Sequence, residues 1–403
     1  MFGFSKEKIN TDSQKIENIL NRGVEDIFVV DSLRKKLESG KELRIKLGID
    51  PTGPKIHIGR AGVLRKLKAF QDLGHKIVLI VGDFTAQIGD PSDKTEKRPM
   101  LTSEKIKENL ADYKNQIGKI IDISKTEFRF NSQWLSKLGF QEIAELAESF
   151  SIQQMSARRN FKDRMEKGQE VSLREFFYPL MQGYDSVAIN ADVELGGFDQ
   201  LFNLKAGRII QRHYGKPEQD VLTIKMLEGT DGRKMSTSWE NAINISDEPN
   251  DMYGKIMSVK DELIYNYFVL CTDLPMSEID SIKESIQSGK NPRDVKAHLA
   301  REIVSLYHGE KKAKEAEDNF ENTFGKGLVP EDVVEVSVAD EAALVDVLLE
   351  KKIVESKLEF RRLISEGAIT NMDTNEKISD TETKVSEGVY KIGKRRFIKI
   401  KIL

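Results

Sequence analysis

A strand, a helix and a second strand follow one another near the start of the chain, and this order restricts the fold more than any other feature. The segment LRIKLGID, residues 43–50, has the composition of a strand and stops at Pro51. Apolar and basic residues then alternate at helical spacing over 58–73. Gly74 ends that run, and HKIVLIVGD, residues 75–83, is typical of a second, fully buried strand. Such a unit predicts a parallel sheet with helices on both faces.

The composition is that of a soluble globular protein with two or three domains. The 403 residues are 39% hydrophobic and 32% charged, enough for at least one sizeable core. The formal net charge of -3 excludes a molecule that is a polycation throughout, so any basic surface must be local.

The chain also has features of a cytoplasmic protein. Its single cysteine, Cys271, excludes an intramolecular disulfide and fits a reducing compartment. The first residues, MFGFSKEKIN, lack the apolar core of a signal peptide. The longest early apolar run, IVLIV at 77–81, is too short to cross a bilayer. We therefore expect a cytoplasmic location and no membrane partner.

Changes of pattern along the chain predict three domains. An α/β domain with a parallel sheet is expected over 1–240, and the periodicity within it predicts an amphipathic helix over 102–121. Residues 241–325 show short helical patterns interrupted by prolines and no convincing strand. We expect a linker at 326–340 and a small α+β domain at 341–403.

The C-terminal domain concentrates positive charge. Ser356 and Glu359 have the spacing of a capping box that opens a short helix, and Gly367 ends that helix. The tail GVYKIGKRRFIKIKIL, residues 388–403, alternates as a strand or hairpin and contains no acid. Lysine on an edge strand also prevents aggregation, but two neighbouring basic elements favour contact with RNA phosphates. The candidate RNA-contacting residues are Lys357, Arg361, Arg362, Lys391, Lys394, Arg395 and Arg396.

Two short segments have the composition of a nucleotide site. PKIHIGRAG, residues 54–62, lies where the first strand passes into its helix, at the end of a parallel sheet where ligands bind. Free N–H groups and the helix dipole attract phosphate there, so His57 and Gly59 are placed to meet it. GTDGRKMSTS, residues 229–238, is a glycine-rich turn that would carry Lys234 to a polyphosphate. Either composition also occurs in surface turns without a ligand.

The two segments together resemble the HIGH and KMSKS signatures of class I aminoacyl-tRNA synthetases, here as HIGR and KMSTS. Further segments in the same order resemble the tyrosyl-tRNA synthetase family: GIDPTGPKIHIG, GDFTAQIGDPSDK, YPLMQGYDS, ADVELGGFDQ and LEGTDG. The last domain is similar to the S4-like RNA-binding module of many bacterial members. The resemblance implies a Rossmann-like catalytic domain with an inserted dimer-interface segment, an α-helical domain for the anticodon region of tRNA, and an α+β S4-like domain.

The same resemblance implies a two-step reaction. Tyrosine attacks the α-phosphate of ATP to give tyrosyl-adenylate and pyrophosphate, and the tyrosyl group then passes to the 3′ end of tRNA(Tyr). Positioning and charge stabilisation carry such chemistry. The residues implied for charge stabilisation are His57, Arg60, Lys94, Arg98 and Lys234. The residues implied for ATP binding are Asp50, His57, Gly59, Arg60, Asp199, Lys234, Met235 and Ser236.

A tyrosine pocket is implied as well. Tyr178, Gln182 and Asp185 fall on one face of a helix. By resemblance, Tyr178 and Gln182 hold the ammonium group and Asp185 holds the phenol. Asp90 is implied to face the ammonium group, and Gln200 the carboxylate.

Three positions depart from the family pattern. Arg60 replaces the second histidine of HIGH, and its fixed charge can bind phosphate in a bidentate way. Thr237 replaces the second lysine of KMSKS, and we expect Arg60 and Arg233 to compensate in part. Lys46 stands where many members place a tyrosine that bonds the phenol, and a buried lysine can also donate to that oxygen.

The expected partners are L-tyrosine, ATP, tRNA(Tyr) and a second copy of the chain. ATP would enter as a substrate with Mg²⁺, and no tightly bound metal or organic cofactor is expected. Two alternatives remain open. One is a synthetase for tryptophan or another relative, and the other is a non-catalytic RNA-binding paralogue in which Arg60 and Thr237 mark lost chemistry.

Overall fold

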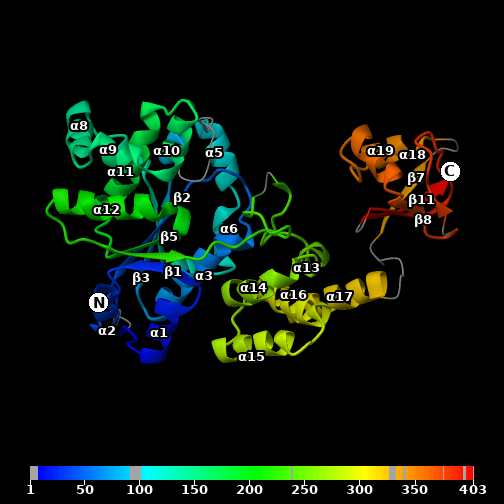
Figure 1. Ribbon diagram of the computed structural model, residues 1–403, viewed down its shortest axis with the longest axis horizontal. Helices are drawn as coiled ribbons and strands as arrows, with labels where there is room; N and C mark the ends of the chain where they lie inside the picture. Colours follow the sequence, from blue (N-terminus) through cyan, green and yellow to red (C-terminus); the bar gives the residue numbers. More distant parts are fainter. Residues whose placement is uncertain are drawn as a thin grey trace, which may run out of the picture. The chain divides into compact units, whose positions relative to one another are not determined.

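Figure 1 shows the computed structural model, which describes residues 8–90, 101–236, 239–325, 333–338, 342–374, 376–393 and 396–402. Some residues named above lie outside these ranges, namely Lys94, Arg98, Thr237, Lys394 and Arg395. The chain divides into two compact units. The first comprises Met1–Asp247 and Ser258–Leu299, and the second comprises Glu248–Met257 and Ala300–Leu403.

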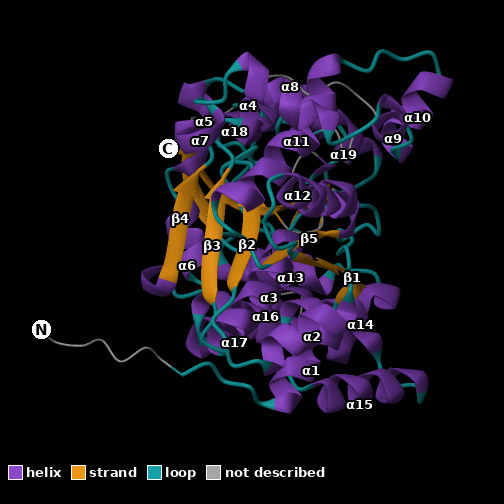
Figure 2. Cartoon of the chain, turned by 90° about the vertical axis from the view of Figure 1, so that its left-hand side faces the viewer, coloured by secondary structure: helices purple, strands orange, loops and turns teal. Residues whose placement is uncertain are grey.

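The first unit is built on a six-stranded sheet in the order β1-β6-β5-β2-β3-β4 (Figure 2). All neighbouring strands run parallel except β1, which pairs antiparallel with β6 at the edge. The predicted strand–helix–strand unit is confirmed, with β2 and β3 in parallel register from Arg44–Lys76 to Ile49–Val81. The strands are β1 (Val24–Phe28), β2 (Arg44–Ile49), β3 (Lys76–Val81), β4 (Thr126–Phe130), β5 (Val193–Gly197) and β6 (Asp220–Ile224).

Helices lie before, between and after these strands along the chain. Those before β5 are α1 (Ser13–Asn21), α2 (Val30–Glu38), α3 (Ile58–Asp72), α4 (Thr85–Ile88), α5 (Ser103–Leu110), α6 (Tyr113–Gly118), η1 (Ile123–Lys125), α7 (Ser132–Leu135), α8 (Phe140–Glu148), α9 (Ile152–Ser156), α10 (Arg159–Glu166) and α11 (Leu173–Ala188). Those after β5 are η2 (Phe198–Gln200), α12 (Leu201–His213), α13 (Pro249–Met257), η4 (Asp261–Leu263), α14 (Ile264–Cys271), α15 (Met276–Gln287), α16 (Pro292–His308), α17 (Glu310–Phe320) and η5 (Glu321–Gly325).

The direction of strand succession reverses between β5 and β2, and this reversal places the site. The chain leaves β2 through α3 to reach β3 on one side, and it leaves β5 through α12 to reach β6 on the other. Because such crossovers are right-handed, the two helices cover opposite faces. Both figures show β5 between α3 and α12. Ligands bind beyond the carboxyl ends of the two strands that flank such a reversal, here β2 and β5.

The central strands are apolar because both faces of the sheet are covered. Ile45, Val78 and Leu195 are at most 1% exposed. Two charged residues, Lys46 on β2 and Glu194 on β5, are completely buried among them. A buried charge is costly unless it is paired. These two residues therefore mark a part of the core that is held by polar contacts.

The helix predicted over 102–121 is two helices, α5 and α6. The chain breaks at Ala111 and Asp112, where the Asp112 carboxylate accepts a hydrogen bond from the Asn115 amide (2.8 Å). The periodic apolar pattern continues through the break, which is why the sequence did not reveal it.

The predicted domain boundary at residue 240 also differs from the compact units. Residues 258–299 belong to the first unit and not to a separate helical domain. The Arg22 guanidinium holds the end of α14 in that unit by donating to the carbonyl oxygens of Val269 (2.9 Å) and Leu274 (2.7 Å). A long-range contact of this kind leaves no local signal in the sequence.

The second unit contains a five-stranded sheet in the order β7-β11-β10-β8-β9. Its hairpin β10–β11 confirms the predicted tail, and Gly367 ends α19 with a φ of 60°. The elements are β7 (Val334–Val338), α18 (Leu344–Glu350), α19 (Lys357–Ser365), β8 (Ile369–Asn371), β9 (Glu376–Lys377), β10 (Gly388–Ile392) and β11 (Arg396–Ile402). Within the described part of the chain, no helix is long and apolar enough to cross a membrane.

Strand β7 corrects the predicted linker at 326–340. It pairs parallel with β11, from Val334 opposite Ile398 to Val338 opposite Ile402. Val336 between them packs into the core of the C-terminal sheet. The alternating valines of VEVSV are a strand pattern, and the surrounding acids concealed it.

Candidate active site

Asp50 lies just beyond the end of β2 and is held from two sides. One carboxylate oxygen accepts a hydrogen bond from the Thr85 hydroxyl (2.8 Å), and the other accepts one from the Tyr178 hydroxyl (2.9 Å). Gly82 makes this approach possible, because a Cβ there would lie 1.9 Å from the Asp50 oxygen. The Asp50 carboxylate is therefore fixed between the end of β2, α4 and α11.

The HIGR segment forms the first turn of α3, as predicted. His57 is the N-cap, and its Nδ1 accepts a hydrogen bond from the Arg60 backbone N–H (3.3 Å). Burial, together with the nearby charges of Arg60 and Lys234, lowers the pKa of His57 to about 3. A neutral imidazole with Nδ1 as acceptor carries its proton on Nε2, which leaves a donor suited to a phosphate oxygen.

The two signature segments meet at Gly59. A Cβ on this glycine would lie 3.0 Å from His57 Nδ1 and 3.5 Å from the sulfur of Met235. The exposed Arg60 side chain donates to the Thr52 hydroxyl (3.1 Å). The predicted pair of HIGR and KMSTS is thus a single place in the fold.

Residues 229–236, the signature loop, are held by a residue that the sequence analysis did not identify. The Asn241 amide donates to Asp231 (2.8 Å) and to the Lys234 carbonyl (3.1 Å), and its oxygen accepts from the Ser236 N–H (2.9 Å). A Cβ on Gly229 would lie 2.5 Å from the Asn241 side chain, so only glycine fits there.

The cation of the signature loop forms an ion pair with Asp199. The Lys234 ammonium lies 2.9 Å from the Asp199 carboxylate, and both side chains are partly exposed. Arg233 points elsewhere: its guanidinium pairs with Asp231 and lies 5.1 Å from the centre of the Trp239 ring. These contacts speak against Arg233 as a substitute for the missing second lysine.

Asp90, which follows the end of α4, and Gln200 of η2 come together. The Gln200 amide donates to Asp90 (2.6 Å), and the Asn203 amide donates to the Gln200 oxygen (3.1 Å). Asn203 is in turn bonded by the buried Arg158 guanidinium (3.1 Å). The two residues implied for the ammonium and carboxylate groups of tyrosine are therefore direct neighbours, backed by a pair that the sequence analysis missed.

Helix α11 presents Tyr178, Gln182 and Asp185 on one face, as their spacing predicted. The Asp185 carboxylate accepts hydrogen bonds from the Trp134 indole (2.7 Å) and the Asn131 amide (3.3 Å). Burial raises the pKa of Asp185 to about 7, although the charge of Lys46 opposes the shift. Asp185 is thus a hydrogen-bond acceptor in which burial favours the protonated form and the Lys46 charge favours the ionised form.

Lys46 does not have the contacts of a phenol donor. Its ammonium donates to the Gln182 carbonyl (2.7 Å) and the Ser186 hydroxyl (2.7 Å), and it pairs with Glu194 (2.9 Å). An ammonium has three N–H groups, and these three partners use all of them. The expected contact of Lys46 with the phenol is therefore corrected: Lys46 holds the frame beneath the pocket.

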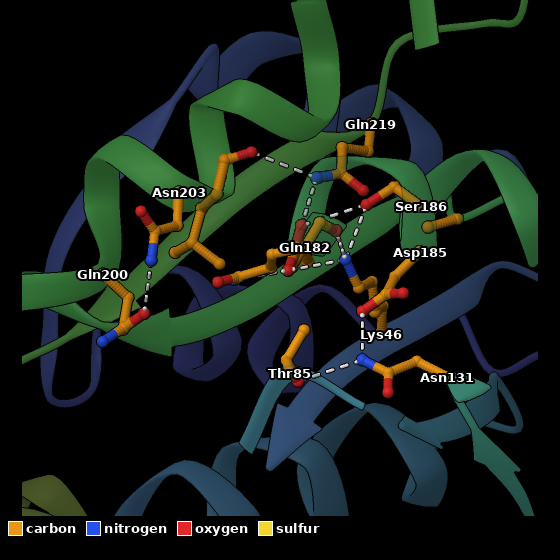
Figure 3. A network of polar contacts seen from close by, with 12 residues as sticks. Lys46, Thr85, Asn131, Gln182, Asp185, Ser186, Gln200, Asn203 and Gln219 are labelled. Carbon is orange, nitrogen blue, oxygen red and sulfur yellow. Dashed lines mark hydrogen bonds and ion pairs between the residues drawn. The ribbon is translucent and has the colours of Figure 1, made fainter. Parts of the chain in front are cut away.

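We call this frame the buried polar cluster: Lys46, Gln182, Ser186, Glu194 and Gln219. Figure 3 labels four of its members, Lys46, Gln182, Ser186 and Gln219. Sequence reasoning missed Glu194, Ser186 and Gln219, as it missed Thr85, Asn131 and Trp134. One signal was available for the central pair. Lys46 and Glu194 are charges with an apolar residue on either side in two strands whose pattern indicates burial, and buried charges of opposite sign require each other.

The candidate RNA-contacting residues differ in how they are engaged. The Arg396 guanidinium donates to the Ile353 carbonyl and pairs with Glu359 (2.8 Å), so its contacts hold the C-terminal fold together. Lys357 and Arg362 are exposed, with longer ion pairs of 3.3 and 3.9 Å to Asp346 and Glu366. Arg361 is exposed on α19 as well, and Lys391 lies 6.0 Å from the centre of the Phe397 ring.

The fold and the two signature segments define a class I aminoacyl-tRNA synthetase. Residues 38–325 match the family model described as "tRNA synthetases class I (W and Y)". The tyrosine–tRNA ligase of Thermotoga maritima is 46% identical over 387 residues, with 95% of this chain and 96% of the relative covered. That of Carboxydothermus hydrogenoformans is 47% identical over 398 residues, with the shares 95% and 96%.

A solved structure agrees with the sequence relatives. The C-terminally truncated mitochondrial tyrosyl-tRNA synthetase of Aspergillus nidulans matches with a TM-score of 0.63 at 25% identity, covering 77% of this chain and 94% of that one. The chain therefore belongs to the tyrosyl-tRNA synthetase family within the class I tRNA synthetases. The family predicted from the sequence is confirmed.

Proposed function

We propose that the chain is a tyrosine–tRNA ligase, which activates L-tyrosine with ATP and transfers the tyrosyl group to the 3′ end of tRNA(Tyr). One observation carries this assignment to the site: Gly59, His57 and Met235 bring both signature segments together at the strand reversal, beside the tyrosine-facing side of α11.

ATP enters as a substrate with Mg²⁺ on its phosphates. The His57 Nε2 proton, the Arg60 guanidinium and the N–H groups of the first turn of α3 face the phosphates. Asp50, Gly59, Met235 and Ser236 complete the nucleotide site. Lys94 and Arg98, outside the described residues, are proposed for the leaving pyrophosphate.

The ion pair between Lys234 and Asp199 assigns a role to each partner. Asp199 receives the ribose hydroxyls, which releases the Lys234 ammonium toward the phosphates. Because both side chains are partly exposed, the pair can open at small cost. The cation then stabilises charge that develops on the α-phosphate and the leaving group.

Tyrosine is held at both ends. Its ammonium group lies between Asp90, Tyr178 and Gln182, its carboxylate is near Gln200, and its phenol donates to Asp185. The relatives at 46% and 47% identity are both tyrosine–tRNA ligases, so we infer tyrosine and not tryptophan as the substrate.

Three further proposals concern partners and location. Phe140 on α8, Ile152 on α9 and Leu173 on α11 are 89%, 78% and 72% exposed, and we assign these apolar side chains to a homodimer contact. Arg361 and its exposed neighbours on α19 meet tRNA phosphates. We place the enzyme in the cytoplasm, where its tRNA would be charged for translation.

The test is amino-acid-dependent exchange of pyrophosphate into ATP, with tyrosine, phenylalanine and tryptophan in parallel. We expect exchange with tyrosine alone, because a buried acceptor left without its hydroxyl partner penalises phenylalanine. Exchange with tryptophan alone would make the chain a tryptophan–tRNA ligase. No exchange with any of the three amino acids would favour the non-catalytic RNA-binding paralogue.

The RNA surface has its own test. Binding of tRNA by the full-length chain is titrated with salt and compared with an Arg361→Ala, Arg362→Ala variant. Removing two phosphate contacts is expected to lower the slope of log K against log salt by about 1 to 2. An unchanged slope would make α19 a solvated surface.

A further inference from the structure

We propose that the buried ion pair of Lys46 and Glu194 is a positioning element that turns the side-chain oxygen of Gln182 toward the substrate's ammonium group. This inference rests on the proposed function, because it concerns how the tyrosine pocket recognises one end of its substrate. Lys46 and Glu194 do not touch the substrate themselves; they act through Gln182.

The first observation is that the pair is closed on all sides. Both side chains are 0% exposed, and their charged atoms are 2.9 Å apart. The three N–H groups of Lys46 are taken by Glu194, the Gln182 carbonyl and the Ser186 hydroxyl. Neither charge can leave the other without being stranded in the interior.

The second observation is the direction of every hydrogen bond at Glu194. Its Oε1 receives Lys46 and the Gln182 amide nitrogen (3.1 Å), and its Oε2 receives the Ser186 hydroxyl (3.2 Å) and the Gln219 amide nitrogen. A carboxylate beside an ammonium is ionised and can only accept. Gln182 must therefore present its NH₂ group to Glu194.

The consequence falls on the other end of the same amide. When the nitrogen of Gln182 is bound inward, its oxygen is the end left for the pocket face that it shares with Tyr178 and Asp185. An amide oxygen accepts from an ammonium group, whereas an amide nitrogen would repel it. An amide with neutral neighbours on both sides could take either orientation, and Glu194 removes that freedom.

The packing around the cluster maintains the arrangement. A Cβ on Gly207 of α12 would lie 2.4 Å from the Gln219 amide nitrogen and 2.9 Å from the Ser186 oxygen. Gln219 also donates to the Leu204 carbonyl (3.2 Å). Helix α12 can therefore approach only with glycine at this position, and the approach holds the donors against Glu194.

The experiment compares two ligands that differ only in the ammonium group. L-tyrosine and 3-(4-hydroxyphenyl)propionate share the phenol and the carboxylate. The dissociation constant of the propionate divided by that of tyrosine therefore measures recognition of the ammonium group. Both constants are determined by calorimetry on the full-length protein and on the variant Lys46→Met, Glu194→Gln. The two changes together strand no charge, yet they replace the acceptor-only neighbour of Gln182 by an amide.

We expect the double variant to lower that ratio roughly tenfold, mainly through weaker binding of tyrosine, because a hydrogen bond to a charged group is lost or misdirected. A purely structural role would weaken both ligands equally and leave the ratio unchanged, which would overturn the proposal. Should the double variant not fold, Glu194→Asp provides the same reading. It keeps the charge pair but withdraws the carboxylate from Gln182, and it should lower the ratio in the same direction.

Ser186→Ala is the matched control. It removes a contact of both Lys46 and Glu194 but leaves the Gln182 amide facing a carboxylate, so the ratio should stay within about twofold of the original. An equal fall in this variant would also overturn the proposal. Failure of the proposed function is distinguishable, since the unmodified protein would then show no preference for tyrosine over its deaminated analogue.

Discussion

The buried polar cluster and the signature loop each contain an ion pair with a nitrogen–oxygen distance of 2.9 Å, and the two pairs do opposite things. The pair of Lys46 and Glu194 has no exposed surface, whereas the side chains of Lys234 and Asp199 are 36% and 26% exposed. In the interior, separating the charges costs several kcal/mol, so the pair is a fixed part of the frame. At the surface, water replaces either partner, so Lys234 can exchange a carboxylate for a phosphate. Under the proposed function, ion pairs of equal length therefore serve substrate recognition in one place and stabilisation of phosphate charge in the other.

The largest expected effect breaks the buried pair from one side. Lys46→Met should lower the free energy of unfolding by ~3–5 kcal/mol, because it leaves the Glu194 carboxylate buried without its counter-charge. Urea unfolding followed by tryptophan fluorescence measures it. Trp134 and Trp239 are the two tryptophans of the chain and both belong to the first unit, so the signal reports that unit.

The control for that prediction removes both charges. Lys46→Met combined with Glu194→Gln should recover most of the loss, since no charge remains stranded. If the single variant were as stable as the double one, Glu194 would not need the charge of Lys46 in the interior. The buried pair would then not differ from the surface pair in this respect.

The second effect is on catalysis and concerns the exposed pair. Lys234→Ala should lower kcat for pyrophosphate exchange by roughly 10²–10³, as removal of one transition-state charge contact does, with tyrosine binding nearly unchanged. Arg233→Ala is the matched control, because its charge is occupied by Asp231 and Trp239, and its kcat should change by less than about threefold. Equal losses in both variants would mean that the loop acts through its total charge.

How far the sequence predicts these two regions differs for a physical reason. The signature loop was found because its residues are contiguous and their chemistry, a glycine turn with a cation, is local. The βαβ unit was found in the same way, through the periods of β2, α3 and β3. The buried polar cluster joins β2, α11 and β5 with Gln219, and no local pattern connects residues so far apart in the chain.

The errors have the same origin. Lys46 was assigned to the phenol because position alone was visible, while its three partners come from other elements. Arg396 was counted with the RNA-contacting cations, although Glu359 and the Ile353 carbonyl engage it. Sequence patterns report what a residue can do, and the fold decides which partner it meets.

A smaller effect should follow from loosening the signature loop without touching its charges. Asn241→Ala removes three hydrogen bonds that join Asp231, Lys234 and Ser236. We expect kcat for exchange to fall roughly tenfold, the cost of leaving one or two such groups unpaired. The Michaelis constant for tyrosine should stay constant, because the buried polar cluster does not depend on the loop. A rise in that constant equal to the fall in kcat would show that the two regions are not independent.

The smallest expected effect is on the pH dependence of tyrosine binding, which tests how the buried polar cluster acts on Asp185. Burial raises the pKa of Asp185 to about 7, with Glu194 acting in the same direction and Lys46 against it. A phenol donates to the ionised carboxylate, so binding favours the deprotonated form and tyrosine affinity rises with pH through this range. With one linked proton, tyrosine should bind up to about tenfold more tightly at pH 8 than at pH 6.

His57 supplies no competing titration, since the pKa of its imidazole is lowered to about 3 and the ring stays neutral throughout. Calorimetric titration of tyrosine at pH 6, 7 and 8 measures the effect, and Asp185→Asn should bind more weakly and with a flat profile. A slope that survives in Asp185→Asn would assign the proton to another group. Such a result would mean that tyrosine binding between pH 6 and pH 8 is not linked to the protonation of Asp185.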